Sequence, residues 1–295
     1  MSSTAMTLLE LPDGRHLDVL VDGPDIAPTL LFHHGTPGSA AQYRFITGAA
    51  RALGLRTVTY SRPGYGGSSR HAGRTVADAV PDALAVLDHV GAADCVTAGW
   101  SGGGPHALAC GSLAPDRVRG VSSMAGVAPY DAADLDFLAG MGAENVQEFE
   151  ATLAGEQRLR EILTPEAEHL GQATPEVIAA EMATLLSASD LAVLSDDFGA
   201  DLAANFREGL RNGPDGWIDD DLAFVRPWGF DPAAIGVPTS VWQGSEDLMV
   251  PYAHGQWLAR NVGRATDRAH LLEGEGHLSV IIGSIEAMLT ELVAG

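Results

Sequence analysis

Short apolar runs alternate with longer helical patterns between Leu17 and Ala125, and few folds accommodate that rhythm. Each apolar run is followed by a segment with helical spacing and then by another apolar run, which is typical of parallel strands joined by helices. The sequence therefore predicts an α/β fold with a mostly parallel sheet flanked by helices. The expected strands are residues 29–33, 56–60, 94–100 and 118–125, and the expected helices are residues 40–53, 76–90 and 105–113.

The alternation stops after Pro129 and resumes near Val225. Between these points the chain reads as consecutive helices rich in acidic residues, Met, Leu and Phe. The α/β rhythm then returns, with strands expected at residues 239–243 and 268–272 and helices at residues 252–261 and 278–293. We therefore expect an α/β core made of residues 1–129 and 226–295, and a helical cap of residues 130–225 inserted after the sixth strand.

The balance of charge excludes several classes of function. Acidic residues outnumber basic ones by 39 to 17, and the net charge of −22 repels nucleic acids and anionic membrane surfaces. All 17 basic residues are arginines, which excludes Schiff-base chemistry, a phosphate-loop lysine and a lysine general base. The expected partner is a small and mostly apolar molecule, bound by a monomer or a homodimer.

Two further patterns bear on location and cofactors. Residues Met1–Leu11 lack the basic cluster and apolar run of a secretory signal, and no apolar stretch reaches the roughly 18 residues of a membrane span. We expect a cytoplasmic protein that does not enter the membrane. Cys95 and Cys110 fall in an apolar strand and an apolar helix, where free thiols act as small core residues. No zinc-ligand spacing occurs, so neither a metal nor another cofactor is expected.

The segment Gly99-Trp100-Ser101-Gly102-Gly103 lies between an apolar strand and a helix. A nucleophile elbow holds its serine in a strained strand-to-helix turn, and small residues must flank that serine two positions on either side. A glycine-rich turn with an incidental serine is the simpler interpretation of the motif alone. The strand-turn-helix setting favours Ser101 as a nucleophile.

A serine nucleophile needs a histidine that accepts its proton. His277 follows the last expected strand, at the carboxyl edge of the sheet where Ser101 also lies. His106 lies inside the helix after Ser101, and His270 lies inside a strand, so we interpret both as structural. His277 is the predicted general base.

The imidazole in turn needs a carboxylate that orients it. Asp247 follows the preceding strand and completes the order serine, acid, histidine. Its neighbour Glu246 is the competing candidate, and an aspartate before Pro251 is also a common turn or capping residue. We predict Asp247 as the third catalytic residue.

Two backbone N–H groups must stabilise the oxyanion formed during acyl transfer. We assign them to Gly102 and to Thr36, which lies in the loop after the third strand. Trp100 and His34, which adjoin these positions, are expected to contact the substrate. A metal site at His33 and His34 is the rival interpretation, but adjacent strand residues point to opposite faces.

Five motifs occur in the order found in the α/β-hydrolase superfamily, which the chain resembles from about Leu17 to its end, apart from the cap. They are His34–Gly38, Arg62–Ser68, Gly99–Gly103, Gly244–Asp247 and Gly276-His277. The resemblance implies a capped serine hydrolase with a Ser-Asp-His triad. Ser61 departs from the family, because many relatives carry an aspartate there, but that position is structural.

The resemblance also narrows the chemistry. Epoxide hydrolases and haloalkane dehalogenases of this fold carry an aspartate where this chain has Ser101, and the former also need cap tyrosines, whereas residues 131–225 contain none. Lysine-dependent hydroxynitrile lyases are excluded. Proline iminopeptidase-like enzymes share the His-Gly loop, but tryptophan usually follows their serine, whereas Trp100 precedes Ser101 here. Peptide substrates therefore remain open but disfavoured.

Apolar side chains in the cap predict a mostly apolar substrate, although most of them must pack the cap helices together. The expected reaction is hydrolysis of a carboxylic ester, lactone or thioester through an acyl-serine. The alternatives are non-hydrolytic use of the triad (perhydrolysis, carbon–carbon cleavage or a tailoring step) and a ligand-binding receptor on a hydrolase fold. The apolar cap residues are Phe137, Leu138, Met141, Phe149, Met182, Leu185, Leu186, Leu191, Phe198, Phe206 and Trp217.

Overall fold

The computed structural model describes residues 6–181, 185–194 and 196–295, so Met182 lies outside the described residues. Their centre is an eight-stranded sheet with the order β1-β2-β4-β3-β5-β6-β7-β8. Strands β1 and β2 pair antiparallel at one edge, β2 also runs antiparallel to β4, and the remaining pairs are parallel. The strands are β1 (Thr7–Glu10), β2 (His16–Asp22), β3 (Thr29–His33), β4 (Arg56–Tyr60), β5 (Cys95–Trp100), β6 (Val118–Met124), β7 (Thr239–Gly244) and β8 (Ala269–Leu272).

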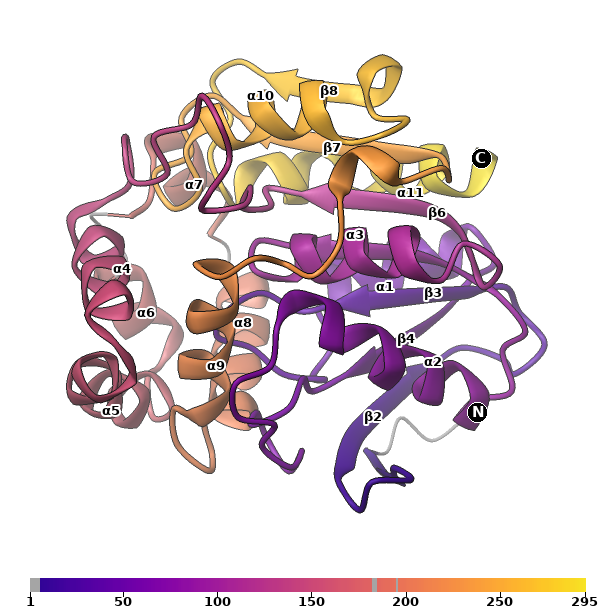
Figure 1. Cartoon of the computed structure of the whole chain (residues 1–295), viewed down its shortest axis with the longest axis horizontal. Coiled ribbons are helices and arrows are strands. Elements are labelled where there is room, and N and C mark those ends of the chain that lie inside the picture. Colours follow the sequence, from indigo (N-terminus) through magenta and orange to yellow (C-terminus); the bar gives the residue numbers. More distant parts are fainter. Residues whose placement is uncertain (1–5, 182–184, 195) are drawn as a thin grey trace.

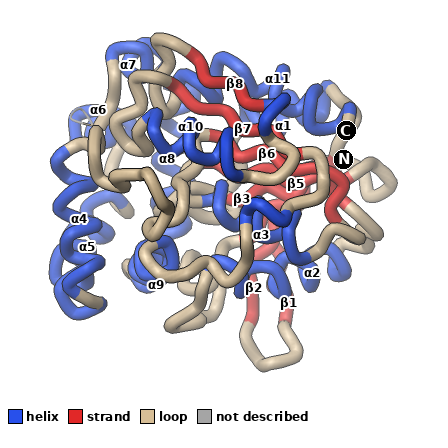
Figure 2. The backbone as a smooth tube through the Cα atoms, turned by 45° about the horizontal axis from the view of Figure 1, so that its top comes forward, coloured by secondary structure: helices blue, strands red, loops and turns tan. Residues whose placement is uncertain are grey.

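Helices cover both faces of this sheet, which confirms the predicted fold class (Figures 1 and 2). Side chains alternate between the faces, so Leu30 and Phe32 pack with α1 and α11, whereas Leu31 packs with α2, α3 and α10. These helices are α1 (Arg44–Ala52), α2 (Ala79–His89), α3 (Gly103–Leu113), α10 (Tyr252–Asn261) and α11 (Ser279–Ala294), with short 3₁₀ turns at Val76–Asp78, Pro232–Ala234 and Thr266–Arg268.

The largest boundary error lies at the start of the first expected helix. The helix expected from residue 40 begins at Arg44, because Ala40 is held at the end of β4. Its N–H donates to Ser61 Oγ (2.9 Å), and its carbonyl accepts from Thr59 Oγ1 (2.6 Å). These contacts keep residues 40–43 out of the helix and fix the segment that follows the predicted oxyanion loop.

Within the described residues, six α-helices lie between β6 and β7, and the described part of residues 130–225 contains no strand. They gather beyond one end of the sheet (Figures 1 and 2). The helices are α4 (Ala143–Ala154), α5 (Glu156–Leu170), α6 (Pro175–Glu181), α7 (Ala188–Val193), α8 (Asp196–Gly209) and α9 (Asp215–Phe224).

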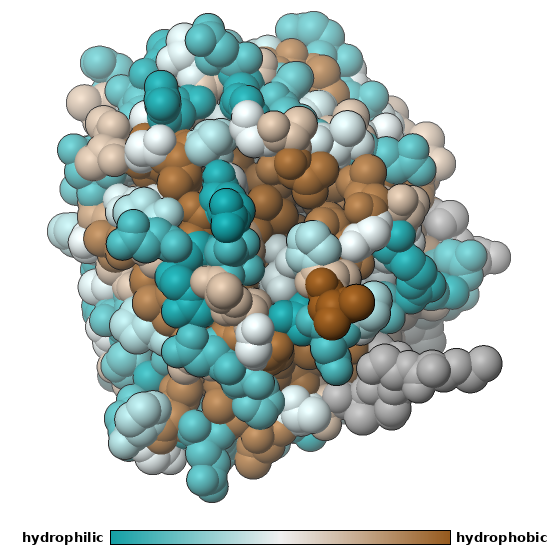
Figure 3. Space-filling model, turned by 90° about the vertical axis from the view of Figure 1, so that its right-hand side faces the viewer, coloured by the Kyte–Doolittle hydropathy of each residue, from teal (hydrophilic) through white to brown (hydrophobic). Residues whose placement is uncertain are grey.

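The face seen in Figure 3 lies at the other end of the molecule, near both termini, and mixes polar with apolar side chains. Among the described helices, none is both long enough and apolar enough to cross a membrane.

Candidate active site

Ser101 occupies the turn between β5 and α3 in a left-handed conformation, with φ of 54°. The turn is held by its N–H, which donates to the Met124 carbonyl (2.8 Å), and by its carbonyl, which accepts from Gly104 N–H (2.9 Å). A side chain at Gly99 would collide with the backbone of Gly103, so the close approach of strand and helix requires glycine there. The structure thus gives Ser101 the strained conformation of a nucleophile elbow.

His277 and Asp247 meet at the end of the sheet that carries Ser101. Nδ1 of His277 donates to Oδ2 of Asp247 over 2.8 Å, and both side chains are buried. Because an ionised carboxylate only accepts hydrogen bonds, this contact fixes the proton on Nδ1 and leaves Nε2 as the basic nitrogen. That tautomer is the one a general base requires.

The structure distinguishes between Asp247 and Glu246, the two candidates for the carboxylate that orients His277. Asp247 Oδ1 accepts from the N–H groups of Met249 (2.9 Å) and Val250 (2.8 Å), and Oδ2 also accepts from Gln243 Nε2 (2.8 Å). Glu246, by contrast, is exposed. Only Asp247 is both buried and bonded to the imidazole, so the geometry favours it over its neighbour.

Asp190, which the sequence analysis did not identify, lies on helix α7 and binds the loop that carries His277. Its Oδ2 accepts from His277 N–H (3.1 Å), and its Oδ1 accepts from the N–H groups of Leu278 (2.7 Å) and Ser279 (2.9 Å). These N–H groups lie at the N-terminal end of helix α11. The fully buried carboxylate of Asp190 therefore caps that helix, although it comes from a distant segment of the chain. The sequence signal is weak, because Ser187 and Asp190 also form an ordinary capping box for α7.

Opposing effects set the pKa of His277. Burial lowers it, but the charge of Asp247, its hydrogen bond and the charge of Asp190 more than offset this effect and raise the pKa above 6.5. Trp100 packs beside the imidazole, with ring centroids 5.7 Å apart. Trp100 is buried, and neither it nor His277 is among the residues that line the cavity, so the structure places this predicted substrate contact against the imidazole.

Thr36 and Gly102 both line the cavity at Ser101. Neither backbone N–H donates a hydrogen bond to any residue that the structure describes. Gly102 directly precedes helix α3, whose N-terminal end carries a partial positive charge. The two free donors are therefore suited to bind an oxygen that becomes negative.

Thr36 is anchored by a buried ionic cluster. Its Oγ1 donates to Asp220 Oδ2 (2.7 Å), and Asp220 also binds Arg62 (2.6 Å) and Arg74 (2.7 Å). Burial alone would raise the pKa of Asp220, but the two arginines hold it well below 3.8. Helix α9 thereby fixes the loop that carries one oxyanion donor.

The two loop histidines are engaged in the scaffold. His34 Nδ1 donates to the Gly35 carbonyl (2.7 Å), and its Nε2 accepts from Arg62 N–H (3.1 Å). His34 is buried and does not line the cavity, so the structure places this predicted substrate contact within the loop itself. The ring of His33 lies against Tyr60 and Cys110, and no cluster of metal-ligating side chains occurs among the described residues.

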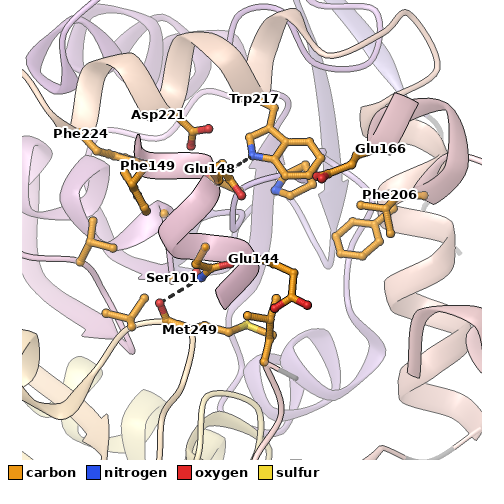
Figure 4. Close-up of a pocket in the computed structure, with 18 of the residues that line it drawn as sticks. Ser101, Glu144, Glu148, Phe149, Glu166, Phe206, Trp217, Asp221, Phe224 and Met249 are labelled. Atoms are coloured by element: carbon orange, nitrogen blue, oxygen red, sulfur yellow. Dashed lines mark hydrogen bonds between the residues drawn. The ribbon is translucent and has the colours of Figure 1, made fainter. Parts of the chain in front are cut away.

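A cavity of about 590 Å³ opens over Ser101 (Figure 4). Its apolar wall includes Phe149, Phe206, Trp217 and Phe224, three of which belong to the predicted apolar set of the cap. Four acidic side chains also line it, and none of the described lining residues is an arginine. The acids are Glu144, Glu148, Glu166 and Asp221. Sequence reasoning missed them, although the run Asp219–Asp221 inside an apolar helix was a usable signal.

Glu148 and Asp221 form a carboxyl pair in the wall of this cavity. Trp217 Nε1 donates to Glu148 Oε1 (2.6 Å), as Figure 4 shows. Burial, the charge of Glu148 and a hydrogen bond to it raise the pKa of Asp221 well above 3.8. Burial also raises the pKa of Glu148, although its hydrogen bonds oppose the shift. Repulsion between the two carboxylates therefore disfavours the state in which both are ionised.

Two curated relatives match part of the chain. Epoxide hydrolase B of Mycobacterium tuberculosis is 31% identical over 113 residues, which make up 37% of this chain and 32% of that protein. An uncharacterized hydrolase of Bacillus subtilis is 31% identical over 107 residues, or 36% of this chain and 37% of that protein. The matches thus span about a third of the length of these relatives.

Solved structures match the whole chain. A hydrolase from Pseudomonas aeruginosa superposes with a TM-score of 0.65 at 21% identity, covering 100% of both chains. An enol-lactonase from Burkholderia xenovorans superposes with a TM-score of 0.66 at 18% identity, covering 98% of this chain and 100% of that one. A family model described as the alpha/beta hydrolase fold matches residues 28–284. The chain therefore belongs to the α/β-hydrolase fold family, as its five motifs predicted.

Proposed function

We propose that the protein is a serine hydrolase that cleaves a carboxylic ester, lactone or thioester through an acyl-serine. The observation that carries the proposal is the 2.8 Å hydrogen bond between His277 and Asp247, at the same end of the sheet as Ser101, which lines the cavity. The left-handed backbone of Ser101 and the two free N–H groups at Thr36 and Gly102 add the remaining parts. No cofactor enters this chemistry.

In the proposed first half-reaction, Ser101 Oγ attacks the substrate carbonyl carbon while its proton passes to Nε2 of His277. The carbonyl electron pair moves to oxygen, and the N–H groups of Thr36 and Gly102 stabilise this oxyanion. By analogy with deleted oxyanion donors, each is worth about 3 kcal/mol in the transition state. The tetrahedral intermediate then expels the alcohol or thiol, which takes the proton from His277.

Water attacks the acyl-serine in the second half-reaction, with His277 as base, and releases the acid and free Ser101. Asp247 stays ionised and stabilises the imidazolium in both halves. We propose that residues 130–225 act as the cap, because α4, α5, α8 and α9 contribute side chains to the cavity wall.

The test is hydrolysis of p-nitrophenyl esters of increasing acyl length, with Ser101→Ala and His277→Ala as variants. Wild type should turn over, and both variants should lose at least about 10³-fold in kcat. Undiminished activity in Ser101→Ala contradicts the proposal. A protein that reacts with a fluorophosphonate at Ser101 but cleaves no ester has a competent nucleophile and a different reaction, such as carbon–carbon cleavage or ligand reception.

Epoxide opening is tested separately with styrene oxide, because one partial relative is named as an epoxide hydrolase. Attack by Ser101 on an epoxide would leave an ether, which a triad cannot hydrolyse. We therefore expect no turnover of styrene oxide.

A further inference from the structure

Helix α9 carries three consecutive buried aspartates, and their partners differ. Asp219 binds Arg70 through both oxygens, at 2.8 and 2.9 Å. Asp220 binds Arg62 and Arg74, as described above. Asp221 lines the cavity, and its Oδ2 is buried without a hydrogen-bond partner among the described residues. Two of the three charges are thus neutralised by arginine, and the third is not.

The uncompensated aspartate faces further negative charge. Glu148 lies beside it on helix α4, and the charge of Glu166 on α5 also acts on it. Glu144 and Glu166 are exposed and line the same cavity. Asp221 also lies near the C-terminal end of α9, where the helix dipole disfavours an anion. Asp221 is buried and Glu148 is half-buried beside it, so a proton or a cation between the two carboxyl groups stabilises the pair.

The cavity wall matches an alkylammonium group better than a bare metal ion. Glu148 accepts a hydrogen bond from Trp217 N–H, and both residues line the cavity together with Asp221 (Figure 4). An ammonium can bind carboxylates and an aromatic face together, and its alkyl chain can run along the apolar wall toward Ser101. The described lining residues include His169 but no arginine.

We propose that the Glu148–Asp221 pair is a subsite for a protonated amine, so that the substrate carries an alkylammonium group on an otherwise apolar chain. This inference rests on the proposed function for the statement that the ligand is also hydrolysed. It replaces the expectation of a mostly apolar substrate with that of an apolar chain ending in a cation.

The binding test compares n-hexylammonium with n-hexanol by titration calorimetry. Wild type should bind the amine at least about tenfold more tightly, which corresponds to ~1.4 kcal/mol. Asp221→Asn mimics the protonated acid, and Glu148→Gln removes the partner charge, so each should bring that ratio close to one. The matched control is Glu150→Gln, an exposed residue of the same helix, which should keep the wild-type ratio.

A ratio near one in wild type, or a wild-type ratio in both pair variants, overturns the subsite. Ser101→Ala separates the two proposals, because it should bind hexylammonium like wild type and yet hydrolyse nothing. Hydrolysis completes the test. Wild type should prefer the p-nitrophenyl ester of ε-aminocaproate over the isosteric heptanoate ester. Asp221→Asn should lose this preference but should still cleave the heptanoate ester. Equal loss of both activities in a folded Asp221→Asn protein would contradict a role in amine recognition.

Discussion

Replacing Asp190 with asparagine tests whether a carboxylate on α7 positions the proposed general base. Asp190 accepts hydrogen bonds from four backbone N–H groups, those of Ser187, His277, Leu278 and Ser279. Asparagine keeps one carbonyl oxygen, but its amide NH₂ then faces two of these donors. The substitution therefore removes two charge-assisted hydrogen bonds and leaves buried N–H groups unpaired.

The expected cost follows from these bonds. A hydrogen bond to a charged group contributes about 1.5–3 kcal/mol, so two lost bonds set a range of about 3–6 kcal/mol. The neutral amide is easier to bury than the carboxylate, which favours the lower end, about 3 kcal/mol. With a slope of about 3 kcal/mol per M, the urea midpoint should fall by roughly 1 M.

The variant should also change the pH dependence of ester hydrolysis. Asp190 contributes to the raised pKa of His277, and the general base must be neutral to act. Loss of the charge should lower that pKa, so kcat/KM of the variant should persist to lower pH than that of wild type. A purely structural role would lower stability without moving the midpoint of the pH profile.

Asp197→Asn is the matched control, because Asp197 is exposed and its ion pair with Arg44 lies on the surface. Its stability should change by less than about 1 kcal/mol. The reasoning is refuted if Asp190→Asn unfolds at the wild-type urea concentration and keeps the wild-type pH profile.

Three other substitutions probe the same site. Asp247→Asn should lower kcat by about 10⁴-fold. It should also shift the acid limb of the pH profile to lower pH, because Asp247 raises the pKa of His277; an unchanged pH–rate curve would exclude Asp247 as the partner of His277. Gly102→Ala adds a Cβ that would lie 2.8 Å from Thr36 Cβ and would disturb the oxyanion donors. We expect kcat to fall about 100-fold with KM nearly unchanged. An equal rise in KM would instead indicate a role in substrate binding. Asp220→Asn leaves two buried arginines without their carboxylate and should cost about 3–5 kcal/mol in chemical denaturation, whereas a loss below about 1 kcal/mol would show that the cluster is not a structural anchor.

The sequence alone determined the order of the core elements and the residue types of the proposed triad. Strands at residues 29–33 and 56–60 match the structure residue for residue. The first is a short, mostly apolar run, and the second is rich in β-branched and aromatic residues, both of which are local signals of a strand. The nucleophile elbow is equally local, since Ser101 needs its strained turn and the small residues within two positions of it.

Tertiary structure decided which acids matter and what they do. Glu246 and Asp247 are adjacent in the sequence, but only the fold buries one of them against His277. Asp190 binds a loop, and Asp221 lines a cavity, that are built from distant segments of the chain. The sequence pattern of an acidic residue on a helix is the same whether its side chain contacts solvent, an arginine or another acid. Hydrophobic patterning is set by local periodicity, whereas the partner of a buried charge is set by how the helices pack.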